Sequence, residues 1–178
     1  MAEPGSGHHI TREDYDVERL IRIIRHLRDT YDLTIYLEPG EAVVLNAGFL
    51  VASVMEIVHN HMDIAILDTS AACHMPDVIE MPYRPPLKDS GEPNEKSHTY
   101  RLDWTYLSGW GCDRGIISFD MPLKEGDQLI FEDMALYTLV KTNTFNGIRL
   151  PDIVRKREDG TCQLVKTFGY EDFKNRLS

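Results

Sequence analysis

A Glu-Pro-Gly turn at residues 38–40 separates two stretches of this chain that have different sequence patterns. Before the turn, apolar residues recur at helical spacing over 17–31, and residues 33–37 alternate like a strand that ends at Glu38. After the turn, the sequence predicts one strand after another. In α/β barrels, ligands bind at the rim where the strands end, so Glu38 is a candidate binding carboxylate. The alternative is a solvated glutamate in a turn at a domain border.

The first residues form a glycine-rich segment with a helix close behind it. Gly5 and Gly7 flank a serine, and Thr11 followed by Asp14 resembles a capping box that marks the helix start. A glycine loop that leads to a helix N-terminus can hold a phosphate, because free backbone N–H groups point at it. A flexible terminus or a cloning scar is the alternative interpretation.

The second stretch predicts a mostly antiparallel β domain. Residues 43–58 are expected to form one long or bent strand, with a bulge suggested by Asn46 and Gly48. Shorter runs predict strands and a final helix, the strands at 63–68, 99–102, 116–119, 128–132, 136–141 and 163–168 and the helix at 170–177. One αβ unit cannot close a barrel. The predicted fold class is therefore α+β, with the remnant of a (β/α) barrel in residues 1–41 and a mostly antiparallel β-barrel or β-sandwich domain in residues 42–178.

Several connections carry their own signals. Residues 146–147 are Asn-Gly and residues 159–160 are Asp-Gly, and both dipeptides are typical of hairpin turns. Prolines within residues 76–85 exclude a central strand there, and residues 86–96 are expected to be exposed and mobile. The His-x-His pair at residues 59–61 has no accompanying third ligand, so we predict a plain turn and no metal site.

Charge and composition limit the kinds of binding partner to expect for this chain. The formal net charge of −10 disfavours nucleic-acid binding and favours small cationic ligands. The longest apolar run, residues 42–58, is too short and too polar to span a bilayer, and no signal peptide is visible at the start of the chain. The three cysteines stand far apart, which fits a reducing cytosol and predicts a cytoplasmic protein without membrane partners.

Four segments together resemble the pyridoxal 5′-phosphate (PLP)-dependent carboxynorspermidine/carboxyspermidine decarboxylases, a family in which an alanine-racemase-type barrel is followed by a β domain. The segments are GSGHHIT at 5–11, LEPGEA at 37–42, HMPDVIEMPY at 74–83, and FEDMALYT at 131–138 with TFNGI at 144–148. They occur in the family's order and cover nearly the whole chain. The chain thus resembles the C-terminal part of an enzyme of polyamine biosynthesis, and residues 1–41 resemble the last part of its PLP-binding barrel.

The resemblance implies positions for the cofactor. Gly5 and Gly7 would belong to the loop that holds the PLP phosphate, although Ser6 stands where the family usually has glycine. Tyr137 would donate its hydroxyl to the same phosphate; the alternative is a core tyrosine of the β domain. Glu38 would face the pyridine nitrogen and keep it protonated, so that the ring can accept the electrons left when CO₂ departs.

The resemblance also implies a cationic, polyamine-type substrate. Ornithine and diaminopimelate decarboxylases carry arginine after the Glu-Pro-Gly, whereas this chain has Glu41. Glu41 and Asp77, which lies on a loop fixed by prolines, would pair with ammonium groups in a partly desolvated pocket. Glu80 and Arg84 are interpreted as ordinary surface residues.

Two departures from the family limit this expectation. The family's Schiff-base lysine lies near the start of the barrel, and no lysine of this sequence stands in a matching motif. We therefore expect the 178-residue chain alone to be inactive. Residues 103–116 also replace a family segment whose cysteine reaches the neighbouring subunit's site, and a one-base shift of reading frame would restore that segment. Cys112 is accordingly a doubtful catalytic candidate.

Two alternatives to this function remain open. One is a related decarboxylase of the diaminopimelate or ornithine type, which Glu41 disfavours. The other is a truncated β domain that does no chemistry. For the full-length enzyme, the resemblance implies a homodimer.

Overall fold

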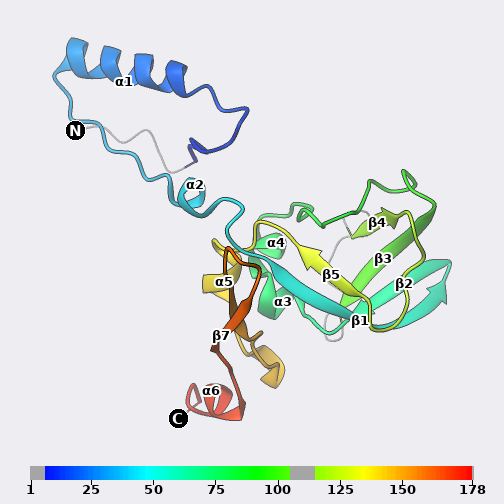
Figure 1. Ribbon diagram of the computed structural model, residues 1–178. Helices are drawn as coiled ribbons and strands as arrows, with labels where there is room; N and C mark the ends of the chain where they lie inside the picture. The colour runs from blue at the N-terminus through cyan, green and yellow to red at the C-terminus, as the bar shows by residue number, and fades with distance from the viewer. Residues whose placement is uncertain (1–6, 105–114, 178) are drawn as a thin grey trace.

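The computed structural model describes residues 7–104 and 115–177. A long helix, α1 (Val17–Tyr31), extends away from a curled sheet that contains most of the buried side chains (Figure 1). A short helix, α2 (Gly40–Val44), lies between the two. Within the described residues, no helix is both long enough and apolar enough to cross a lipid bilayer.

Helix α1 begins later than its sequence signal predicted. Its N-cap is Asp16, whose side chain accepts a hydrogen bond from the backbone N–H of Arg19 at 2.8 Å. The capping box expected at Thr11 is therefore wrong. The Thr11 hydroxyl instead donates to the backbone carbonyl of Ala42 at 2.6 Å, which ties the segment before α1 to α2.

The strand expected at residues 33–37 is not formed, since only Ile35 takes part in a β-bridge. The side chains of this segment do alternate between partly buried and exposed, as predicted. A strand of a parallel barrel is stabilised by hydrogen-bonded neighbours, and the described residues supply no ladder here. The segment is an extended connection between α1 and α2 (Figure 1).

Residues 43–58 do not form the single strand that their alternation predicted. Their first part completes α2, and β1 (Leu50–Asn60) begins only after a turn in which Asn46 has a φ of 60°. The bulge lies between Val54 and Glu56, within β1, and not near Asn46. The Pro-Gly pair that ends the preceding segment therefore starts a helical turn before the sheet begins.

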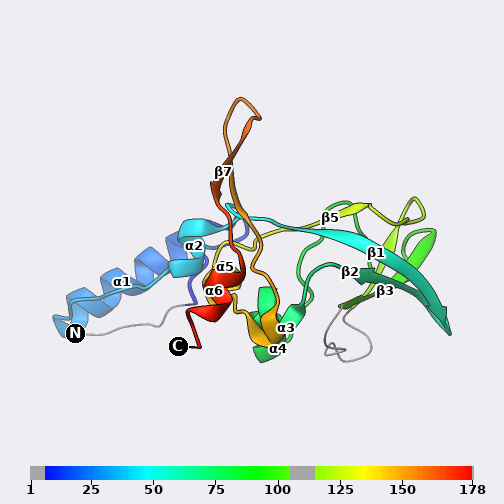
Figure 2. The ribbon, with the colours of Figure 1, turned by 90° about the horizontal axis from the view of Figure 1, so that it is seen from below.

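The sheet has five strands in the order β4-β3-β2-β1-β5. The strands after β1 are β2 (Met62–Leu67), β3 (His98–Trp104), β4 (Ile116–Phe119) and β5 (Gln128–Phe131). Strands β2 and β3 pair in parallel and the other neighbours are antiparallel, so the sheet is mixed but mostly antiparallel. It curls strongly along β1 and β2 (Figure 2). The α+β class is confirmed in this coarse form.

Three short helices pack against one another beside the sheet: α3 (Ala71–His74), α4 (Pro76–Glu80) and α5 (Thr138–Lys141). The strand predicted over residues 136–141 is therefore wrong. Its residues favour β-structure locally, but the side chain of Thr138 is hydrogen-bonded to α4, and this tertiary contact overrides the local preference.

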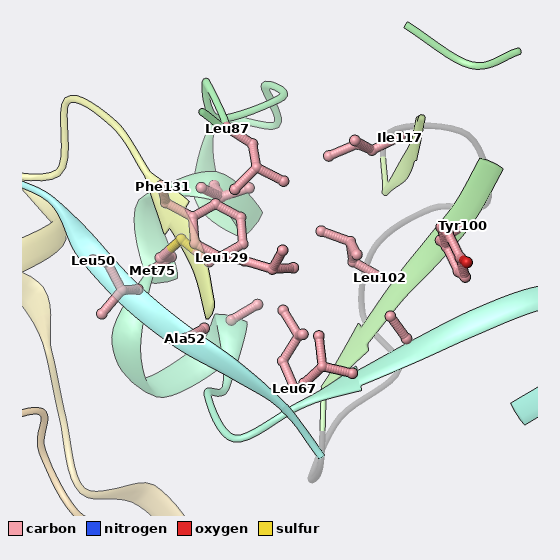
Figure 3. Packing of buried hydrophobic residues seen from close by; sticks show 14 of the residues in the cluster. Leu50, Ala52, Leu67, Met75, Leu87, Tyr100, Leu102, Ile117, Leu129 and Phe131 are labelled. Atoms are coloured by element: carbon pink, nitrogen blue, oxygen red, sulfur yellow. The ribbon is translucent and has the colours of Figure 1, made fainter. Parts of the chain in front are cut away.

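The core is one cluster of apolar side chains enclosed by the curled sheet and α3 (Figure 3). Phe131 and Leu67 are completely buried, and each such side chain contributes about 1.5–3 kcal/mol to folding. The labelled members of the cluster are Leu50, Ala52, Leu67, Met75, Leu87, Tyr100, Leu102, Ile117, Leu129 and Phe131.

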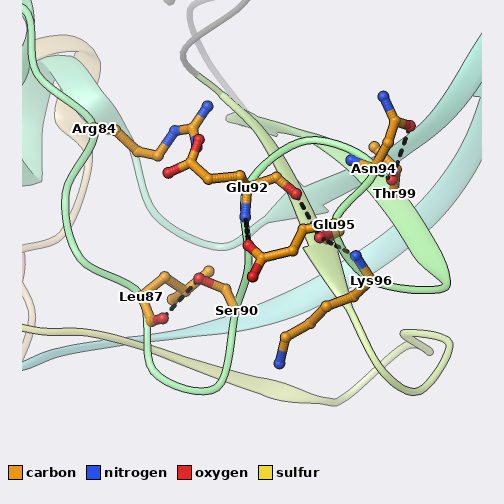
Figure 4. A network of polar contacts seen from close by, with 9 residues as sticks. Arg84, Leu87, Ser90, Glu92, Asn94, Glu95, Lys96 and Thr99 are labelled. Atoms are coloured by element: carbon orange, nitrogen blue, oxygen red, sulfur yellow. Dashed lines mark hydrogen bonds and ion pairs between the residues drawn. The ribbon is translucent and has the colours of Figure 1, made fainter.

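Residues 86–96 are not the loose excursion that their composition predicted. Figure 4 shows a hydrogen-bonded loop in which the Glu92 N–H donates to Oε2 of Glu95 at 2.7 Å. The Glu92 carbonyl accepts from the Ser118 hydroxyl at 2.6 Å. The Ser118 oxygen in turn accepts from the Lys96 N–H at 3.0 Å. Arg84 and Glu92 form an ion pair across the loop. Because Ser118 is completely buried on β4, the loop is fixed to the sheet.

The C-terminal part projects from the sheet as a two-stranded hairpin (Figure 2). Strands β6 (Ile153–Lys156) and β7 (Cys162–Lys166) are joined by the predicted Asp-Gly turn, and the helix α6 (Tyr170–Lys174) follows, shorter than the predicted 170–177. The hairpin predicted at Asn146 is wrong. A 3₁₀ turn, η1 (Phe145–Gly147), stands there without flanking strands.

Candidate functional site

Two turns that are far apart in the sequence lie against each other and carry Glu41 and Tyr137. The Met134 N–H donates to the Gly48 carbonyl at 2.8 Å, and the Asn46 N–H donates to Oδ1 of Asp133 at 3.0 Å. A third contact comes from the glycine before Glu41, because a Cβ built on it would lie 3.9 Å from the side chain of Leu136. The segments 40–48 and 133–137 therefore form one junction.

An open pocket of about 410 Å³ lies at this junction. Its lining residues are His9, Thr11, Arg12, Glu13, Asp14, Glu41, Leu45, Asn46 and Asp133. Four of them are carboxylates and one is an arginine, so the pocket is acidic and suits a cation. The Glu41 side chain is 41% exposed, and its Oε2 lies 3.2 Å from Nε2 of His9. Glu41 is thus placed to meet a ligand from solvent.

Two of the predicted cofactor residues, Glu38 and Gly7, lie outside the lining of this pocket. Glu38 is exposed, outside the core and outside the pocket lining, and its backbone carbonyl accepts from the Gly40 N–H at 2.9 Å. Gly7 is exposed with open space around it, since a Cβ there would meet nothing within 4 Å. Gly5 lies outside the described residues, as does Cys112 together with most of the suspected frameshift segment.

Asp77 is not in the pocket lining, although it was expected to serve the same ligand as Glu41. It is 9% exposed, and its carboxylate accepts hydrogen bonds from two hydroxyls. Tyr83 donates to Oδ2 at 2.7 Å, and Thr138 lies 3.1 Å and 3.2 Å from the two oxygens. Burial, and then the hydrogen bond to Asp77, raise the pKa of Tyr83 well above its usual 10.0. The phenol therefore stays a hydrogen-bond donor at neutral pH.

Tyr137 is half-exposed beside this buried group, directly before Thr138. Its backbone has φ 53° and ψ −50°, which a residue other than glycine seldom adopts. Nζ of Lys141 lies 5.2 Å from the centre of its ring and forms an ion pair with Glu80. The hydrogen bond that Lys141 donates to this carboxylate raises the pKa of Lys141, so a positive charge stands next to the phenol.

Several residues of the site were assigned no role from the sequence. His9 and Asp133 complete the pocket around Glu41, and Tyr83 and Thr138 satisfy Asp77. Tyr83 is six positions from Asp77, but the partners of the other residues lie tens of positions away, so no local spacing reveals those contacts. Of the His-x-His pair, only His61 lies in the turn between β1 and β2; His59 is in β1, with its Nδ1 2.8 Å from Oδ1 of Asp63 on β2. The described residues contain no cluster of metal-ligand type.

Comparison with known structures first defines the class of the fold. The chain superposes on diaminopimelate decarboxylase from Helicobacter pylori, in a complex with L-lysine, with a TM-score of 0.71 over 98% of this chain and 44% of that one. The sequence identity is 17%, so this likeness concerns the fold alone. The described residues therefore share the fold of about half of that protein. No family model matches the sequence.

Other relatives are more similar to this chain in sequence. The carboxynorspermidine decarboxylase of Campylobacter jejuni, solved with norspermidine, has a TM-score of 0.85 and 41% identity over 98% of this chain and 50% of that one. A curated carboxynorspermidine/carboxyspermidine decarboxylase of C. jejuni is 43% identical over 97% of this chain, and a carboxyaminopropylagmatine decarboxylase of Synechocystis is 41% identical over 97%. The chain spans about half the length of these curated relatives, 48% and 45%. The resemblance is confirmed: this chain is homologous to about half of a carboxynorspermidine/carboxyspermidine decarboxylase.

Proposed function

We propose that this chain forms part of a PLP-dependent decarboxylase that converts carboxynorspermidine or carboxyspermidine to norspermidine or spermidine. The observation that carries the proposal is the acidic pocket at the junction of residues 40–48 and 133–137, with Glu41 open to solvent. A pocket with four carboxylates matches a substrate whose tail bears ammonium groups. By the resemblance, the same position is arginine in the ornithine and diaminopimelate decarboxylases.

The residues near this junction fit a PLP group. Gly7 leaves open space in which backbone could approach a phosphate, and Tyr137 has a half-exposed phenol with the Lys141 charge beside it. Glu38 is exposed at the end of an extended segment, where its carboxylate could hold a ring nitrogen protonated. PLP, when bound, supplies a ring that accepts the electron pair left by departing CO₂. The lysine that carries it would come from outside the 178 residues.

Glu41 and Asp77 are the proposed substrate residues, and they differ in how they can act. Glu41 can contact an ammonium group directly, in place of His9, from the wall of the pocket. Asp77 is nearly buried, and its oxygens already accept from two hydroxyls. Asp77 remains a predicted substrate residue through its negative charge, and a direct contact would require its hydroxyl partners to give way.

The remaining expectations concern the whole protein. We propose that residues 1–41 complete a PLP-binding barrel and that residues 42–178 form the β domain. In support, α1 leaves Ile23 and Tyr31 exposed, at 46% and 61%, as a barrel helix would before packing on further chain. A homodimer and a cytoplasmic location stay predictions for the full-length protein.

A second substrate is favoured by one specific comparison. The Synechocystis relative is named for carboxyaminopropylagmatine, and it matches this chain nearly as well as the C. jejuni relative does. The second candidate function is therefore decarboxylation of a substrate whose tail ends in a guanidinium group. A carboxylate such as Glu41 could bind either cation, and a guanidinium would allow a two-point contact.

The test is CO₂ release by the complete gene product supplied with PLP. We expect kcat/KM for carboxynorspermidine or carboxyspermidine to exceed that for meso-diaminopimelate and ornithine by about 100-fold or more. The longer tails of the former carry two ammonium groups toward the acidic pocket, whereas ornithine carries one and the distal end of diaminopimelate is a zwitterion without net charge. Preference for carboxyaminopropylagmatine would select the second candidate. An equal kcat/KM for meso-diaminopimelate would overturn both candidate functions. The 178-residue chain alone should release no CO₂.

A further inference from the structure

The backbone around Tyr137 forms a strained γ-turn. The Thr138 N–H donates to the carbonyl of Leu136, two residues earlier, at 2.6 Å, and Tyr137 between them has φ 53° and ψ −50°. This is the rare form of the γ-turn, which places the side chain of its central residue in a crowded position. Such conformations persist only where the surrounding structure holds them, and they gather at functional sites.

Fixed contacts hold the chain on both sides of this turn. On the N-terminal side, the Met134 N–H is bonded to the Gly48 carbonyl at 2.8 Å. On the C-terminal side, the Lys141 N–H donates to the Tyr137 carbonyl at 2.8 Å, which starts α5. The strongest side-chain anchor is Thr138, which is 3% exposed and whose hydroxyl lies within 3.2 Å of both carboxylate oxygens of Asp77.

Asp77 is itself well fixed. It lies on α4, its backbone carbonyl accepts from the Met81 N–H at 2.9 Å, and Tyr83 donates to its Oδ2 at 2.7 Å. A buried carboxylate held by its own helix and by a phenol is a rigid acceptor for the Thr138 hydroxyl. The charged acceptor also makes this hydrogen bond stronger than one between neutral groups.

We propose that Asp77 is a positioning residue: through the hydroxyl of Thr138 it holds Tyr137 in the γ-turn and so aims the phenol at the cofactor phosphate. The inference rests on the proposed role of Tyr137 in binding that phosphate. It adds a function for Asp77 that is separate from any contact with the substrate tail, and it gives Thr138 a function of its own.

The size of the effect follows from the strain. Without the Thr138 anchor, the turn relaxes and only a small fraction of the molecules keeps the conformation that binds the phosphate. The apparent affinity for the ligand falls in proportion to that fraction. A strain of the size usual for such backbone outliers corresponds to a loss of about 5- to 150-fold. The loss should appear only for ligands that carry the phosphate.

The experiment is titration of the complete protein with PLP and with pyridoxal, which lacks the phosphate, followed by absorbance. Thr138→Val keeps the shape of the side chain and removes the hydroxyl, and we expect it to weaken PLP binding by about tenfold or more. It should leave pyridoxal binding unchanged, and Thr138→Ser should restore PLP binding. Unchanged PLP affinity in Thr138→Val, or an equal loss for pyridoxal, would overturn the inference.

Tyr137→Phe separates this inference from the proposed function on which it rests. If Tyr137→Phe leaves PLP affinity unchanged, the phenol does not bind the phosphate and the proposed role of Tyr137 fails. If Tyr137→Phe weakens PLP binding and Thr138→Val does not, only the positioning role of Asp77 and Thr138 fails.

A second measurement needs no cofactor and covers the case in which Thr138→Val does not fold. Tyr137→Gly and Tyr137→Ala both remove the ring, but only glycine accepts a positive φ without strain. In the intact Thr138 background, Tyr137→Gly should unfold at a temperature about 2–4 °C higher than Tyr137→Ala. An alanine variant as stable as the glycine variant would show that the turn stores no strain, and the positioning role would be withdrawn.

Discussion

Gly48 lies so close to Ala135 that a Cβ on the glycine would sit 2.8 Å from the alanine backbone. This contact joins the segment that follows Glu41 to the segment that precedes Tyr137. The hydrogen bond from Met134 to the Gly48 carbonyl lies in the same place. The acidic pocket and the Tyr137 turn are therefore parts of one junction, and its geometry depends on a residue without a side chain at position 48.

Gly48→Ala should destabilise the protein. The added methyl group would meet backbone atoms, which cannot move aside like a flexible side chain, so we expect a loss of about 1–3 kcal/mol in the free energy of unfolding. Urea denaturation measures it. Gly7→Ala is the matched control, because a Cβ there meets nothing within 4 Å and stability should not fall. A Gly48→Ala variant as stable as the Gly7→Ala variant would contradict the close approach.

Stability should also fall in mild acid because of His74, which is 3% exposed. Its Nδ1 accepts from the Ser70 N–H at 3.1 Å, and its Nε2–H donates to the Arg149 carbonyl at 3.0 Å. Burial lowers the pKa of His74 below 6.5, although the Arg149 carbonyl and the Asp68 charge act in the opposite direction. The folded state therefore holds the neutral ring where the unfolded chain already binds a proton.

The sign of the pH effect follows from this difference. The contribution of His74 is fully present above pH 6.5 and is lost as the pH falls below that value, until the native histidine itself protonates. The slope should reach up to about 1.4 kcal/mol per pH unit in this window. His74→Gln, which keeps a donor and an acceptor but cannot titrate, should remove this slope. An identical slope in the variant would assign the acid sensitivity to other groups.

The buried hydroxyl of Ser118 should matter more to stability than an exposed one. Ser118→Ala leaves the Lys96 N–H without this acceptor and removes one of two donors to the Glu92 carbonyl, which also accepts from the Glu95 N–H, so we expect a loss of about 1–3 kcal/mol. Ser90→Ala serves as the comparison, because this partly exposed hydroxyl makes one bond, to the Leu87 carbonyl, and water can replace it. Equal losses in the two variants would show that the loop is not anchored through Ser118.

The elements that could be predicted from the sequence are those set by local pattern. Helix α1 follows from apolar residues at helical spacing, and the β6–β7 hairpin follows from its Asp-Gly turn. The strands of the sheet after β1 also fall close to their predicted ranges. In each case the signal lies within a few residues, so a neighbour distant in the sequence is not needed to see it.

The predictions that were wrong concern elements whose structure depends on contacts with residues distant in the sequence. Residues 136–141 favour a strand locally, but Thr138 is bonded to Asp77, 61 positions earlier, and the segment forms α5. The same holds for the site. Glu41 was picked out through the resemblance, as a glutamate where related decarboxylases have arginine, whereas the closeness of His9 and Asp133 depends on a junction that no spacing reveals.

The central claim is that Glu41 and its acidic pocket bind the amine-bearing tail of the ligand. Calorimetric titration of the complete protein with norspermidine tests it most directly, with Glu41→Gln compared against Glu158→Gln, whose exposed carboxylate lies in the connection between β6 and β7. We expect Glu41→Gln to weaken norspermidine binding by about tenfold or more, because a charge-assisted contact is lost, and Glu158→Gln to leave it unchanged. Norspermidine binding that is unaffected by Glu41→Gln, or reduced equally by both variants, would contradict the account.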